Sequence, residues 1–155
     1  MKRFFFDCGT RDTTASLGIL ALRLMTGLMM LLGHGWVKIQ NYPMLKDKFE
    51  LKVYPFQYFA SSMNLILCIA AEAGAAALII IGLCTRPAAF VLGFTMVVAA
   101  FGVHGADPWF MGAGVPAAKE PALLYLIPMI AIILTGGGAF SLDAAIYKDG
   151  KRRRW

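Results

Sequence analysis

The chain has 155 residues, of which 59% are hydrophobic and only 15% are charged, and its formal net charge is +6. Soluble domains of this length are less apolar, so the composition excludes an ordinary soluble protein. Long apolar runs in such a chain predict membrane spans, each of which needs about 20 residues.

Four such runs follow one another along the chain, at about residues 16–35, 63–83, 87–103 and 121–142. They lack the alternation of apolar and polar residues that marks an outer-membrane barrel. Since lipid cannot hydrogen-bond to a bare backbone, each run is expected to be a helix. The predicted fold class is therefore all-α: an integral membrane bundle of four transmembrane helices, in one domain over residues 1–155.

The first span follows Lys2, Arg3 and Arg11, which resemble the basic start of a signal peptide. Its apolar run is long, however, and ends in GHGWVKI rather than in a cleavage site of small residues. We therefore expect a helix that is retained in the membrane. Its two notable polar residues are Arg23, near the inner end, and His34, at the outer end.

The second span, NLILCIAAEAGAAALIIIGL at residues 64–83, is apolar almost throughout but carries Glu72 near its middle. An ionisable group at mid-bilayer costs at least about 2.5–3.5 kcal/mol, so it usually has a partner. At the rise of a helix, Glu72 and Arg23 differ in depth by roughly 6 Å, which a long arginine side chain can bridge. An Arg23–Glu72 pair could fix the packing of the two helices, or it could line a polar cavity for a quinone or a proton. The remaining alternative is that the charges snorkel to the membrane surface or have other partners.

The connections also carry patterns. We expect a tight turn at the TRP of residues 85–87, which makes spans two and three an antiparallel hairpin with Arg86 anchored among headgroups. Residues 36–62, rich in aromatics and lysine and including Lys38, are predicted to be interfacial. Residues 104–120 predict an irregular loop. The GGG at 136–138 interrupts the fourth span near its inner end, and Ser141 with Asp143 is expected to cap a short helix beyond it.

His34, His104 and Glu120 are expected at similar depth near the outer face. Two imidazoles could ligate a metal or haem, they could exchange protons with a quinone headgroup, or they could form ordinary interfacial hydrogen bonds. Because these residues form no closely spaced motif, no metal site is predicted. Trp36 and Trp109 are interpreted as interfacial anchors.

Basic residues are unevenly distributed between the two faces, with nine on one side and five on the other. The positive-inside rule therefore predicts that both termini are cytoplasmic. The tail KDGKRRRW is expected to hold this topology and to touch anionic lipid headgroups, and no nucleic acid is expected as a partner. Cys8, Cys68 and Cys84 form no CxxC motif, which argues against a thiol–disulfide enzyme.

These segments resemble the DoxX family of small four-helix bacterial membrane proteins. The resemblance covers about residues 18–146 and rests on LALRLMTGLMMLLGHGWVKI, EAGAAALIIIGLCTRPAA, the histidine that ends span three and KEPALLYLIPMIAIILTGGGAFSLDAAI. It carries over the family's polar positions as Arg23, His34, Lys38, Glu72, Arg86, His104, Glu120, Ser141 and Asp143.

The resemblance implies a membrane subunit of a quinone-linked redox complex, because related proteins include DoxD-type subunits of thiosulfate:quinone oxidoreductase. A quinone is then the possible cofactor, and lipids and larger membrane subunits are the expected partners. The alternative is a non-catalytic assembly subunit packed against a larger respiratory or other membrane complex. A small transporter is a weaker alternative, because four short helices leave little room for a pore.

Overall fold

The computed structural model describes residues 9, 10 and 12–146. Several predictions concern residues outside this range. They include Cys8, Arg11 and the basic residues near both ends of the sequence, which are predicted to lie at the inner face. Within the described range the chain is helical and contains no strand.

The first helix is continuous from Thr13 to Gln40. It consists of α2 (Thr13–Met30), a π-helical segment η1 (Leu31–Gly35) and α3 (Trp36–Gln40). The Asp12 side chain accepts a hydrogen bond from the Ala15 backbone N–H and so caps its start. The helix runs beyond the predicted end at residue 35, so Lys38 belongs to it rather than to a separate interfacial segment.

Two further helices are long and apolar enough to cross a membrane. The first combines α5 (Ser61–Ile69), the π-helical η3 (Ala70–Ala75) and α6 (Ala76–Ile81), and the second combines α7 (Thr85–Val97) with the π-helical η4 (Val98–Val103). The fourth apolar helix, α8 (Glu120–Thr135), has 16 residues. At 1.5 Å per residue it is only about 24 Å long, short of the roughly 30 Å hydrocarbon core.

Glycines set two helix ends on the same side of the bundle. Gly82 ends α6 with φ +73°, and Gly136 and Gly138 follow α8 with φ +77° and +73°. These left-handed conformations stop a helix at little cost only in glycine. The predicted turn at residues 85–87 is therefore wrong by a few positions. The chain turns at Gly82–Cys84, and Pro87 sits in the first turn of α7, where a missing N–H costs nothing.

The helices form a bundle in which α7 packs along α8 and α2 packs against α6. Its core combines larger side chains with alanines, which let the backbones approach closely. The larger core residues are Met30, Ile79, Leu92, Met96, Met129 and Ile132. Large apolar side chains such as Met25, Phe90 and Leu134 are exposed on the outside, where they contact lipid.

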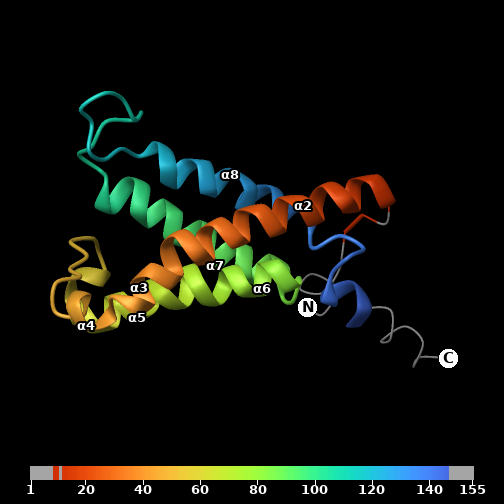
Figure 1. Cartoon of the computed structure of the whole chain (residues 1–155), viewed down its shortest axis with the longest axis horizontal. Coiled ribbons are helices and arrows are strands. Elements are labelled where there is room, and N and C mark those ends of the chain that lie inside the picture. The colour runs from red at the N-terminus through yellow and green to blue at the C-terminus, as the bar shows by residue number, and fades with distance from the viewer. Residues whose placement is uncertain (1–8, 11, 147–155) are drawn as a thin grey trace.

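The two long connections lie at one end of the bundle, and the start of α2 lies with residues 139–146 at the other (Figure 1). The first connection contains α4 (Tyr42–Leu45) and a short 3-10 helix η2 (Phe56–Tyr58). The second, between η4 and α8, has no regular structure. We refer to these two ends as the loop end and the glycine end.

Candidate functional site

Arg23 does not reach Glu72. The side chain is 1% exposed and donates to four backbone carbonyl oxygens. Nε donates to Ile79 O at 2.9 Å and Nη2 to Ile80 O at 3.0 Å, at the end of α6. Nη1 donates to Gly137 O and to Phe140 O, in the segment after α8. The predicted Arg23–Glu72 pair is therefore wrong, because the planar guanidinium fork binds carbonyls that a helix end and a glycine loop leave unpaired.

Asp143 and Ser141 also lie at the glycine end. Ser141 Oγ accepts from Ala144 N at 3.2 Å, as the cap of a short helical turn does. The carboxylate of Asp143 instead accepts from Cys84 N and Thr85 N, each at 2.8 Å, and from Thr85 Oγ1 at 2.7 Å. It caps α7 rather than its own segment, and so ties the chain after α8 to the hairpin turn. Arg86, in the first turn of α7, is partly buried.

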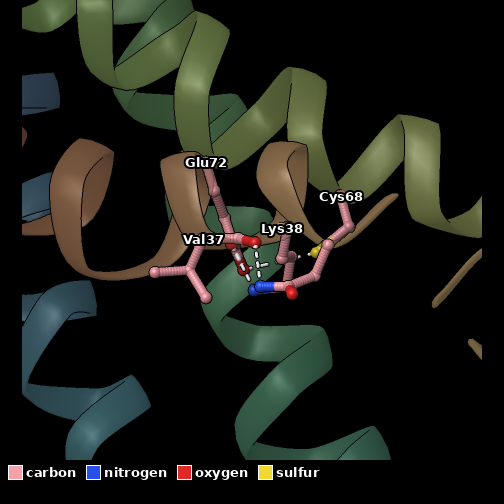
Figure 2. Close-up of polar contacts among 5 residues, drawn as sticks. Val37, Lys38, Cys68 and Glu72 are labelled. Atoms are coloured by element: carbon pink, nitrogen blue, oxygen red, sulfur yellow. Dashed lines mark hydrogen bonds and ion pairs between the residues drawn. The ribbon is translucent and has the colours of Figure 1, made fainter. Parts of the chain in front are cut away.

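Glu72 pairs with Lys38, which extends from α3 across to η3 (Figure 2). The Glu72 side chain is 8% exposed and that of Lys38 is 20% exposed. The second carboxylate oxygen accepts from Cys68 Sγ at 3.3 Å, one turn earlier on the same helix. Sequence reasoning missed this pair because it ended the first helix at residue 35. The available signal was the spacing of His34 and Lys38, which places both on one helix face.

A cavity of about 450 Å³ lies beside this pair, toward the loop end. All four apolar helices and both connections contribute to its wall, which is mostly apolar. Its polar residues include His34 and Lys38 from the first helix, Asn64, Cys68 and Glu72 from the second, and His104 from the end of the third. Thr95 from α7 and Tyr125 from α8 add a hydroxyl each. A concave, largely apolar space with a few convergent polar groups is the usual form of a small-molecule site.

Three π-helical segments surround the cavity. His34 lies in η1, Glu72 lies in η3, and His104 directly follows η4. A π-turn widens the helix and changes the direction in which the following side chains point, and such segments are frequent at functional sites. Each of the three long helices thus has a π-helical segment beside the cavity, which marks this region. Nothing in the sequence pattern signalled them.

Of the predicted outer group, His34 and His104 line the same cavity, whereas Glu120 does not. Both histidines line the cavity, but each has a different neighbour. The ring of His34 packs edge-on against Tyr125, with centroids 5.6 Å apart, and His104 Nδ1 lies 2.7 Å from Asp107 Oδ2.

Glu120 is not among the cavity residues and accepts from Met111 N at 2.8 Å. Among the described residues, no three of the metal-ligating types His, Cys, Asp and Glu lie close enough together to hold a metal ion. Trp109, a predicted interfacial anchor, packs against Phe101 and under Lys119.

Comparison with known proteins gives a family and one relative. The family model described as DoxX matches residues 18–105. An uncharacterised protein of Haemophilus influenzae is 37% identical over 71 residues, which cover 46% of this chain and 53% of the relative. The match thus spans about half the length of that relative. No solved structure matches the chain at a significant level.

Proposed function

Since this chain belongs to the DoxX family of membrane proteins, we propose that it binds a quinone in the cavity at the loop end and serves a quinone-linked redox complex of the bacterial inner membrane. In this proposal α8 and the glycine segment complete a fourth span, and both termini are cytoplasmic. The observation that carries the proposal is a largely apolar cavity with a buried ion pair in its wall.

The position of the cavity selects the kind of ligand. Much of its wall comes from the three helices that are long and apolar enough to cross a membrane, so we expect a ligand to enter it from the lipid. His34 lines the cavity and is also exposed on the outside of the bundle, next to Tyr125. A lipid-soluble molecule with a polar head and an apolar tail fits both the mostly apolar wall and this route.

The polar groups suit the head of a quinone, whose two carbonyl oxygens accept hydrogen bonds. Lys38 has three ammonium donors and gives one to Glu72, so others remain for a ligand oxygen. The histidines add ring nitrogens near the same space, which can donate or take up protons. The attraction between Glu72 and Lys38 offsets part of the desolvation cost of holding a charged donor in an apolar wall.

Filling the cavity tests the proposal. Ala99 lines it from η4, so Ala99→Phe places a ring in the ligand space. Ala70→Phe adds the same ring at an exposed position of η3 outside the cavity and is the matched control. The measurement is equilibrium binding of a decyl-tailed benzoquinone to the purified protein in detergent, corrected for binding to empty micelles.

We expect saturable binding by the wild type and by Ala70→Phe, and at least a tenfold loss of affinity in Ala99→Phe. Equal affinity in all three proteins would show that the quinone does not occupy this cavity. An absence of saturable binding to the wild type would leave the assembly-subunit alternative.

A further inference from the structure

Asn64 has a buried acceptor without a partner. The residue is 1% exposed, lies in the first turn of α5 and lines the cavity. Its Nδ2 donates to Phe56 O at 3.0 Å, which fixes the orientation of the amide, because a flipped amide would set two oxygens against each other. Oδ1 is then buried with no hydrogen-bond partner in the described part of the chain. Buried polar atoms are nearly always paired, so this oxygen requires an explanation.

Asn64 lies on the same face of the second helix as Glu72, the acidic member of the ion pair. Asn64, Cys68 and Glu72 are spaced four residues apart, so they follow one face of the second helix along the cavity. Asn64 and Glu72 are thus about 12 Å apart along the helix axis. A six-membered ring with oxygens at opposite corners, extended by a hydrogen bond of about 2.8 Å at each end, spans a similar length.

The two ends of this row of residues, Glu72 and Asn64, offer different hydrogen-bonding groups to a ligand. At the Glu72 end, Lys38 can donate to a carbonyl oxygen or to a hydroxyl oxygen, and the carboxylate can accept from a hydroxyl. At the Asn64 end, the unpaired group is an acceptor only, because Nδ2 is already bound to Phe56 O. Oδ1 is itself buried, so a small shift of side chains at the cavity wall has to bring it to a ligand. A carbonyl oxygen placed there would face another oxygen, whereas a hydroxyl would donate to it.

We propose that Asn64 Oδ1 accepts a hydrogen bond from a ligand hydroxyl, so that the cavity favours the hydroquinone over the quinone. This rests on the proposed function and adds the redox state to it. The two forms differ by two electrons and two protons, and only the reduced form carries hydroxyl donors at both ends of the ring. Asn64 is then the residue that discriminates between them, and Lys38 holds either form.

The experiment compares the two forms of one probe. The affinities of decyl-tailed benzoquinone and of its hydroquinone are measured anaerobically, by equilibrium dialysis, on the full-length protein in detergent. Asn64→Leu removes the acceptor. Thr95→Val is the matched control, because Thr95 also lines the cavity but its hydroxyl is bound to Val91 O. The readout is the ratio of the two affinities, which general damage to the Phe56 loop would not change.

We expect the wild type and Thr95→Val to bind the hydroquinone about tenfold more tightly than the quinone, as one hydrogen bond to a buried acceptor allows. In Asn64→Leu the ratio should fall to about one, through loss of hydroquinone affinity. Equal wild-type affinities, or a ratio unchanged by Asn64→Leu, would overturn the inference and leave the proposed function standing. Failure of the wild type to bind either form would overturn both.

Discussion

At the scale of single residues, the two buried charges Glu72 and Arg23 have different partners. Glu72 interacts with Lys38 and Cys68, whereas Arg23 donates its hydrogen bonds to backbone carbonyl oxygens. Ile79 and Ile80, which Arg23 contacts, lie seven and eight residues beyond Glu72 on a helix, hence about 10 Å away. The two charges therefore belong to separate sites, one in the cavity wall and one at the glycine end.

This separation predicts the pattern of a double-mutant cycle. Glu72→Gln leaves Lys38 charged and unpaired in an apolar wall, and should destabilise the protein by about 3 kcal/mol. Adding Lys38→Met removes the unpaired charge and should recover much of this loss. Combining Glu72→Gln with Arg23→Gln should instead give additive losses within about 0.5 kcal/mol, as expected for distant sites.

The measurement is the free energy of unfolding in a mild detergent for each single and double variant. Additive losses for Lys38 and Glu72 would contradict the pair seen here. A strong coupling of Arg23 with Glu72 would instead support the pair expected from the sequence.

The sequence predicts that these charged residues need partners, but it does not identify the partners. That Glu72 needs a partner, and that Arg23 is buried, follows from the cost of a charge in lipid. The choice of partner did not follow, because depth was the only coordinate available and it does not show which face of a helix a side chain occupies. The partners of Arg23 are uncharged backbone carbonyls, so looking for opposite charges does not identify them. The partner of Glu72, Lys38, lies beyond the helix end that the sequence predicted.

At the scale of elements, the π-helical segments η1 and η3 approach each other at Gly35. A methyl group added to Gly35 would lie 2.9 Å from N, Cα and Cβ of Ala73. Two of these atoms are backbone and cannot move aside as a side-chain end can. Gly35 therefore allows the close contact that brings the Lys38-bearing helix against the Glu72-bearing helix.

Gly35→Ala should consequently destabilise the protein by about 1–3 kcal/mol through overpacking, and should weaken quinone binding. Gly33→Ala is the control in the same π-helical segment, because a methyl group there meets no atom within 4 Å. It should leave stability unchanged or slightly raised, since alanine favours helix over glycine. Thermal unfolding of the two variants decides this, and equal melting temperatures would contradict the role assigned to Gly35.

The apolar runs located these helices from the sequence, because hydrophobicity over some 20 residues is a strong signal. The π-helical segments could not be found in this way, since they depend on packing between helices and not on a local pattern. The end of α8 at Thr135, before the expected 142, follows from the glycine segment, which the sequence did mark as an interruption.

At the scale of the whole molecule, the loop end and the glycine end are the two faces that a membrane would separate (Figure 1). In the proposed orientation, which follows the positive-inside rule, the loop end faces the periplasm. Ala113 is exposed in the second connection, and Ala145 is exposed at the glycine end. Ala113→Cys should therefore react with a membrane-impermeant maleimide in intact cells, and Ala145→Cys only after lysis. The unsubstituted chain gives the background, and the reverse labelling pattern would contradict the proposed orientation.

Our central proposal is that the cavity within the bundle holds a lipid-soluble redox ligand. Native mass spectrometry of the protein, extracted in mild detergent from its own membranes, tests this most directly. We expect a bundle with an adduct of the mass of the membrane's quinone or hydroquinone, present in Ala70→Phe and absent in Ala99→Phe. Bundles that carry no such adduct and are held by larger subunits would contradict it and identify an assembly subunit.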